Sequence, residues 1–148
     1  MKILVIHGPN LNMLGKRDPN KYGTVTMEQI NHELESISKK LHIELEFFQS
    51  NHEGSIIDFL QKESSRVADG LITNPGALIR YAYSFRQALV DFNKPFIELH
   101  MSDISKTGVN KKINILDDVP NRIKQITGMK EQSYYVALQE LITYLQSN

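Results

Sequence analysis

Short apolar runs alternate with segments of helical spacing along the whole chain. Residues 3–6, Ile-Leu-Val-Ile, are closed by Gly8-Pro9 and are typical of a strand buried on both faces of a parallel sheet. Four further strands are expected at 43–48, 71–73, 96–99 and 123–127. Since helices are expected between most of them, this order predicts an α/β fold: a three-layer sandwich with right-handed crossovers.

The expected helices rest on capping and periodicity. Residues 26–29, Thr-Met-Glu-Gln, have the form of a capping box, and apolar residues follow at helical spacing up to Leu41. Helical stripes also occupy 56–60, 81–92 and 135–145. The polar stretch 102–112 has neither period, and we therefore expect a loop there.

Length and composition restrict the function. The 148 residues suit one domain spanning 1–148, and 41% hydrophobic residues are typical of a packed protein. Equal numbers of acidic and basic residues offer no general attraction for nucleic acid or anionic lipid, so a small-molecule partner is expected. The chain has no cysteine, which fits a cytoplasmic location, and no apolar run as long as a membrane span.

In a parallel α/β sheet, ligands bind beyond the carboxyl ends of the strands. The corresponding segments are 8–22, 49–54, 74–77 and 100–107. The first is long for a connection between strand and helix, which indicates a site or a lid. It lacks the spacing of a P-loop, and the chain contains no dinucleotide-binding glycine motif, so no nucleotide cofactor is expected.

Tyr22 and Arg17 of the first segment are candidates for proton chemistry. An unperturbed phenol has a pKa of about 10 and is only about 0.1% ionised at pH 7. A guanidinium within a few ångströms commonly lowers such a pKa by about 1 to 3. Asn10 and Asn12 in the same segment could instead serve as turn residues, and Arg17 and Tyr22 as solvated loop side chains.

His100 directly follows the expected strand 96–99, at the edge where ligands bind. Histidine is readily poised as a general acid near neutral pH, and Glu98 lies on the same side of the strand, where its carboxylate could hold the imidazolium. The alternative is a structural histidine at a strand end. None of the histidines has the spacing of a metal site, so no catalytic metal is expected.

Taken together, these segments resemble the type II 3-dehydroquinate dehydratases. The resemblance is carried by the first loop with Gly-Pro-Asn-Leu-Asn, by Gln49 to Gly54, by Asn-Pro-Gly-Ala at 74–77, and by Glu98 with His100 and Ser102. It implies a flavodoxin-like fold with a five-stranded parallel sheet, commonly assembled as a homo-dodecamer built from trimers. It also implies dehydration of 3-dehydroquinate to 3-dehydroshikimate, in the shikimate or quinate pathway, with neither metal nor organic cofactor.

The same resemblance implies roles for individual residues. Tyr22, as phenolate, takes a proton beside the substrate ketone, and Arg17 stabilises the phenolate and covers the site. Asn10 and a bound water hold the resulting enolate, and His100 protonates the departing hydroxyl. Asn74 and the backbone around Met101 and Ser102 bind the substrate's carboxylate and hydroxyls.

Several positions depart from the family pattern, and each concerns substrate binding. Ile79-Arg80 replaces the usual Thr-His, and Gln87 replaces an aspartate that reaches a neighbouring subunit's site. Thr107-Gly108-Val109 replaces Arg-Glu-Glu, and Lys111 replaces an arginine, which loses a planar fork for carboxylates. Arg80 could compensate. The alternatives are therefore a dehydratase for another cyclic hydroxy-ketone acid and a ligand-binding protein without turnover.

Overall fold

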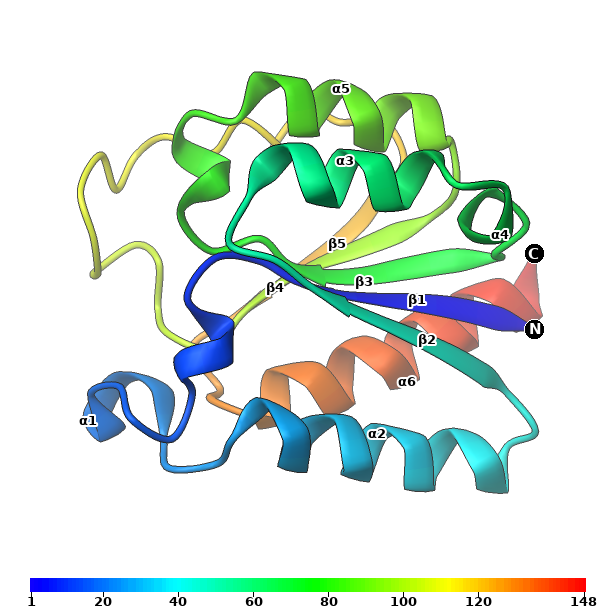
Figure 1. The fold of residues 1–148 in the computed structure, drawn as a ribbon, viewed down its shortest axis with the longest axis horizontal. Coiled ribbons are helices and arrows are strands. Elements are labelled where there is room, and N and C mark those ends of the chain that lie inside the picture. The colour runs from blue at the N-terminus through cyan, green and yellow to red at the C-terminus, as the bar shows by residue number, and fades with distance from the viewer.

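A five-stranded parallel sheet forms the centre of the computed structural model, which describes residues 1–148 (Figure 1). The strand order is β2-β1-β3-β4-β5, which is the flavodoxin-like order, so the predicted α/β architecture is confirmed. Each strand begins and ends within one residue of its predicted range. The strands are β1 (Lys2–His7), β2 (Glu44–Gln49), β3 (Gly70–Asn74), β4 (Phe96–His100) and β5 (Arg122–Thr127).

Helices cover both faces of the sheet (Figure 1). On one face lie α2 (Met27–Lys40) and α6 (Gln132–Ser147), and on the other lie α3 (Glu53–Gln61), the short α4 (Glu63–Arg66) and α5 (Tyr83–Phe92). Successive β1 residues point to opposite faces, so Ile3 joins the core under α2 and α6, whereas Leu4 joins the core under α3 and α5. No helix is long and apolar enough to span a membrane.

The predicted capping box opens α2. The Gln29 backbone N–H donates to the Thr26 hydroxyl oxygen at 3.2 Å, and the Thr26 N–H donates to the Gln29 side-chain oxygen at 2.9 Å. The apolar stripe that follows is buried, with Ile30 and Leu34 fully shielded from solvent. The sequence pattern therefore fixes both the start of this helix and the face that it buries.

The segment from Gly8 to Gly23 is more ordered than a plain loop. It contains the 3-10 helix η1 (Leu11–Met13) and the short helix α1 (Pro19–Tyr22). The Asp18 carboxylate caps α1 by accepting from the Asn20 N–H at 3.0 Å, and Pro19 supplies a favourable first residue. A further 3-10 helix, η2 (Gly76–Arg80), precedes α5, which begins two residues later than predicted. Residues 102–112 form no strand or helix, as predicted.

The segments after β1 and β3 lie against each other at the carboxyl edge. The Gly8 N–H donates to the Asn74 carbonyl at 2.8 Å, and a Cβ on Gly8 would lie 2.7 Å from the Pro75 carbonyl oxygen. Only glycine permits this approach. In Figure 1 the segment after β1 and the long segment after β4 both lie at this edge, and the two chain termini lie at the opposite one.

Candidate active site

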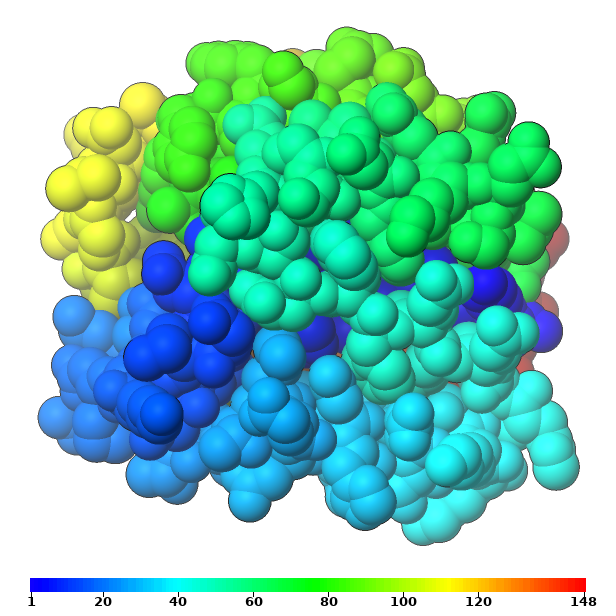
Figure 2. Space-filling view, in the orientation of Figure 1, coloured from blue at the N-terminus to red at the C-terminus, as the bar shows by residue number.

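A pocket of about 240 Å³ opens at the carboxyl edge of the sheet. Its volume is below the ~300–1,000 Å³ of sites for drug-sized ligands, so it suits a smaller molecule. Figure 2 shows two of the chain segments that line it, the blue 10–22 region and the yellow region near 110, next to each other at the left of the molecule. Eight of the ten predicted site residues line the pocket: Asn10, Arg17, Tyr22, Asn74, Arg80, His100, Met101 and Ser102.

Tyr22 and Arg17 are held together on one wall of the pocket. Tyr22 is the last residue of α1, and the central carbon of the Arg17 guanidinium lies 3.8 Å from the centroid of its ring. Such a contact is attractive because the aromatic face carries partial negative charge. Arg17 also has no carboxylate partner. Its charge is therefore available to the phenol and to a bound anion.

Asn10 is held by the segment that follows β2. Its φ of 70° places it in the left-handed region, which asparagine tolerates better than most residues, and its backbone N–H donates to the Asn51 side-chain oxygen at 2.9 Å. The Gln49 amide donates to the Gly8 carbonyl at 3.3 Å and to the same Asn51 oxygen at 3.2 Å. Residues 49–51 thus hold the first loop from outside the pocket, and they fix the backbone at Asn10, which lines the pocket.

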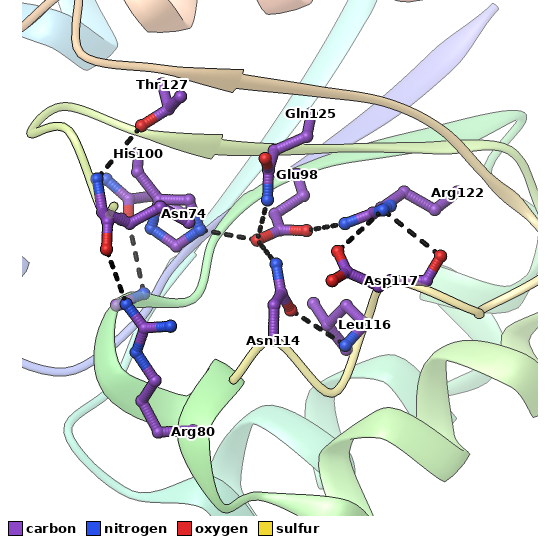
Figure 3. A network of polar contacts seen from close by, with 12 residues as sticks. Asn74, Arg80, Glu98, His100, Asn114, Leu116, Asp117, Arg122, Gln125 and Thr127 are labelled. Atoms are coloured by element: carbon purple, nitrogen blue, oxygen red, sulfur yellow. Dashed lines mark hydrogen bonds and ion pairs between the residues drawn. The ribbon is translucent and has the colours of Figure 1, made fainter. Parts of the chain in front are cut away.

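His100 ends β4 and is paired with Glu98, as the alternation of a strand predicts. Its Nε2 lies 2.7 Å from the Glu98 Oε1, and both side chains are almost completely buried (Figure 3). With Nε2–H donating to the carboxylate, Nδ1 is the nitrogen left to exchange a proton with a ligand. The pair therefore has the arrangement of a general acid held by a buried anion.

The Glu98 carboxylate accepts from three further side chains (Figure 3). The Asn114 amide donates to Oε1 at 2.7 Å and the Gln125 amide at 3.1 Å, while the Arg122 guanidinium donates to Oε2. Burial by itself would raise the pKa of Glu98, but the hydrogen bonds and charges of His100 and Arg122 outweigh it, and the pKa lies below its usual range. Glu98 is accordingly an anion at neutral pH.

Sequence reasoning did not find Arg122, Asn114 and Gln125. They come from β5 and from the irregular segment before it, and no spacing along the chain links them to Glu98. β5 pairs with β4 so that Gln125 lies opposite Glu98. The strand order brings Arg122 and Gln125 to the carboxylate, and the path of the segment before β5 brings Asn114 there, so only the tertiary structure could have revealed these donors.

Met101 and Ser102 line the pocket, and both have free backbone N–H groups. Their N–H groups donate to no protein acceptor, whereas their carbonyls accept from Lys130 N–H at 2.9 Å and from the Thr127 hydroxyl at 2.8 Å. Because buried N–H groups are almost always paired, two adjacent free ones beside a pocket are suited to bind an anionic group of a ligand.

Gln87 and Lys111 do not line the pocket of a single chain. Gln87 lies on α5 and donates to the Asp91 carboxylate at 2.9 Å. Lys111 is exposed in the segment after β4, where its carbonyl accepts from Arg80 at 3.2 Å. Arg80 lines the pocket, but both of its Nη atoms donate to backbone carbonyls. The residues predicted to carry proton transfer thus line one pocket, whereas part of the predicted substrate-binding set lies outside it.

His7, at the end of β1, is buried away from the pocket lining. Its Nε2 lies 2.7 Å from the Asn31 side-chain oxygen, and its Nδ1 lies 2.7 Å from the Tyr134 hydroxyl. Burial lowers the pKa of His7 to about 4, although the hydrogen bond to Asn31 and the charge of Glu28 oppose the shift. His7 is therefore neutral in the folded protein at neutral pH.

We expect His7 to make stability depend on pH. The unfolded chain binds a proton at this residue below about pH 6.5, whereas the folded chain binds it only below about pH 4, so the free energy of unfolding falls as pH drops through this window. The full effect is about 3 kcal/mol. Urea unfolding at several pH values measures this dependence. The free energy of unfolding should depend less on pH in His7→Asn than in the wild type, whereas the exposed control His32→Asn should show the wild-type dependence. An equal slope in His7→Asn and the wild type would contradict this assignment.

No group of three or more histidine, aspartate or glutamate side chains is placed to hold a metal ion. The pocket instead offers a phenol with a guanidinium, an imidazole with a buried carboxylate, and free backbone N–H groups. This set, at the carboxyl edge of a flavodoxin-like sheet, defines an α/β protein equipped for acid–base chemistry on a small anionic ligand.

Comparisons with known proteins identify the family. The family described as dehydroquinase class II matches residues 1–142. A 3-dehydroquinate dehydratase of Dictyoglomus turgidum is 44% identical over 144 residues, covering 97% of each chain, and one of Halothermothrix orenii is 40% identical over 145 residues, covering 98% of this chain and 96% of the relative. The chain belongs to the class II dehydroquinases.

Solved structures agree with this assignment. The crystal structure of a type II dehydroquinase from Butyrivibrio crossotus superposes with a TM-score of 0.88 at 38% identity, covering 96% of this chain and 97% of the other. A type II dehydroquinase from Propionibacterium acnes gives a TM-score of 0.85 at 29% identity, with 96% of each chain covered. The similarity thus extends over nearly the whole fold.

Proposed function

We propose that this protein is a 3-dehydroquinate dehydratase, a hydro-lyase that removes water from 3-dehydroquinate to give 3-dehydroshikimate in the shikimate or quinate pathway. One observation carries the mechanism: Tyr22 under the Arg17 guanidinium and His100 on the Glu98 carboxylate line the same small pocket. Elimination of water requires a base and an acid that both reach one bound substrate ring. Family membership supports the choice of substrate.

In the first step, Tyr22 as phenolate takes a proton from the carbon beside the ketone. The C–H electrons move to the ketone oxygen and form an enolate. Asn10 and a water bound beside it stabilise this oxygen by hydrogen bonds, as in an oxyanion hole. The Arg17 guanidinium carbon lies 3.8 Å from the centroid of the Tyr22 ring, so its positive charge attracts the phenolate that this step uses.

In the second step, the enolate collapses to the enone and the carbon–oxygen bond to the hydroxyl breaks. His100 donates a proton from Nδ1 to that oxygen, which leaves as water. Glu98 stabilises the imidazolium before transfer. Proton exchange with solvent then returns Tyr22 to phenolate and His100 to imidazolium, so that atoms and charge balance over the cycle.

Substrate binding uses the polar groups that remain. The free N–H groups of Met101 and Ser102 bind the substrate carboxylate, and Asn74 binds a hydroxyl. The carboxylate is further attracted by Arg17, which has no acidic partner. Closure of the first loop would bring Arg17 inward and exclude water.

The direct test is incubation of the purified protein with 3-dehydroquinate while the ultraviolet absorbance of the conjugated enone is recorded. We expect absorbance to rise without added metal or cofactor. No product between about pH 6 and about pH 9 would contradict the proposal. Binding of 3-dehydroquinate without product would instead favour the ligand-binding alternative.

Arg17→Ala tests the role of the guanidinium. Removal of the cation leaves the negative phenolate oxygen without its positive neighbour, so kcat/KM should fall by about 10-fold or more. Steady-state kinetics measure this, with Lys16→Ala as a control because Lys16 is exposed and outside the pocket. A kcat/KM equal to that of the control would refute the assigned role of Arg17.

A second candidate substrate is another cyclic hydroxy-ketone acid. The observation that favours it is the placement of Arg80, whose Nη atoms bind carbonyls where the family pattern has a histidine. A panel of such acids assayed beside 3-dehydroquinate separates the two. A higher kcat/KM for another member would reassign the substrate and leave the proton-transfer steps in place.

We further propose a homo-dodecamer built from trimers, located in the cytoplasm. Tyr81, directly after η2, and Tyr83, the first residue of α5, are 59% and 68% exposed, and Val109 at the pocket wall is 77% exposed. Such exposure of large apolar side chains supports a contact with another copy of the chain. Light scattering on the native protein should give twelve times the 17.0 kDa chain mass, and a monomer would overturn the assembly.

A further inference from the structure

Arg80 occupies an unusual position between the pocket and the segment that follows β4. It is the last residue of η2, and it lines the same pocket as Asn74 and His100, which Figure 3 also labels. Its Nη2 donates to the Ile104 carbonyl at 2.9 Å, and its Nη1 donates to the Lys111 carbonyl at 3.2 Å and to the Ile113 carbonyl. All three acceptors are backbone groups of one irregular segment.

These acceptors lie on both limbs of that segment. Ile104 is on the limb that leaves β4, whereas Lys111 and Ile113 are on the limb that returns toward β5. The tip between them, residues 105–110, includes Thr107, Gly108 and Val109, which line the pocket. The position of this pocket wall therefore depends on how the two limbs are held.

Each limb also has anchors of its own. The Thr127 hydroxyl donates to the Ser102 carbonyl at 2.8 Å on the outgoing limb, and the Ile115 N–H donates to the Ile79 carbonyl at 2.9 Å on the returning limb. Among the side-chain hydrogen bonds to this segment, only those of Arg80 join the two limbs. Without Arg80, each limb stays attached at its base while the tip loses its cross-link.

The chemistry of arginine explains why this residue suits the position. A guanidinium is planar and presents donors in diverging directions, so that one side chain can reach carbonyls on separate strands of chain. A lysine ammonium is a single point, and an imidazole has only two ring nitrogens. Hydrogen bonds from a charged donor are also stronger than those from a neutral one.

We propose that Arg80 is a positioning residue that latches the 102–113 segment and so fixes the Thr107–Val109 wall of the pocket. It determines substrate affinity through this wall and does not touch the reacting atoms. The kinetic part of this inference rests on the proposed dehydratase function, whereas the latch itself can be measured without any substrate.

Limited trypsin digestion measures the latch, because Lys106, Lys111 and Lys112 are exposed in the segment. In Arg80→Met, cleavage after these residues should accelerate by about 10-fold or more, since loss of the cross-link makes local opening easier. The control is Arg66→Met, because Arg66 is exposed on α4 without a side-chain partner. Its rate of cleavage in the segment should equal that of the wild type.

Two conservative variants guard against loss of folding. Arg80→Lys and Arg80→His keep a polar side chain but lack the diverging donors of a guanidinium, so both should be cleaved faster than the wild type. Thermal unfolding of each is recorded alongside. Cleavage at the wild-type rate in all three Arg80 variants overturns the latch.

Kinetics separate the latch from direct substrate contact. A loosened wall should raise KM for 3-dehydroquinate by about 10-fold, with a smaller change in kcat. A raised KM with wild-type protection from trypsin would mean that Arg80 binds the substrate directly, and the latch would be wrong. If the wild type forms no product, the dehydratase function fails, but the digestion still decides on the latch.

Discussion

Tyr22→Phe should abolish turnover while leaving ligand binding intact. The substitution removes only the ionisable oxygen, and the ring can stay beneath the Arg17 guanidinium 3.8 Å away. Loss of a positioned base commonly costs about 10²- to 10⁴-fold in rate, and we expect kcat to fall by at least about 10³-fold. The Kd for 3-dehydroquinate, measured by calorimetry with the inactive variant, should stay within about threefold of the wild-type KM.

A matched control is available for this variant. Tyr144→Phe removes a hydroxyl from an exposed tyrosine of α6 that lies outside the pocket, and it should keep wild-type kcat. If Tyr22→Phe retained kcat within about tenfold of the wild type, the phenolate could not be the base. The elimination would then require another proton acceptor in the same pocket.

Glu98→Gln should damage both catalysis and stability. The carboxylate is fully buried and accepts from His100, Arg122, Asn114 and Gln125. A glutamine replaces one of the two carboxylate oxygens with an NH2 group. At least one of the four side chains that donate to Glu98 would then face this NH2 donor and lose its hydrogen bond. Breaking a buried charged pair by removing one partner typically costs about 3–5 kcal/mol.

The catalytic cost follows from the same contact. Without the carboxylate, the His100 imidazolium loses its anion and its fixed orientation, and we expect kcat to fall by about 10²-fold or more. Urea unfolding and steady-state kinetics measure the two effects. The control is Glu140→Gln, because Glu140 pairs with Lys124 at 2.8 Å on the surface, where such pairs contribute about 0–1 kcal/mol. Equal stability of Glu98→Gln and the control would contradict the assignment.

The sequence predicted the parts of the site that depend on consecutive residues. The strand ending at His100 and the two-residue step to Glu98 place both side chains on one side of β4, and the structure joins them at 2.7 Å. The sequence also predicts that Asn74 and His100 lie at one edge of the sheet, because parallel strands bring their carboxyl ends together, and β3 and β4 are paired in this way. Both predictions follow from the regular geometry of a strand and need no knowledge of loop conformation.

Other features of the site depended on contacts between distant segments. The helical turn that presents Tyr22 arises from the Asp18 cap, which an irregular polar stretch did not reveal. The hydrogen bonds of Arg80 to the 102–113 segment have no sequence signature. A side chain in a loop is oriented by whatever lies opposite it, and this is set only when the chain has folded.

What the amino-acid sequence determined alone was the order of elements, the faces that they bury and the edge at which polar residues gather. These properties follow from local periodicity and capping, which each segment carries within itself. The tertiary structure decided which donors surround Glu98, where Arg17 lies over Tyr22, and that Gln87 and Lys111 stay outside the pocket of one chain. Those outcomes depend on strand order and loop packing, because groups far apart in sequence meet only when the sheet has formed.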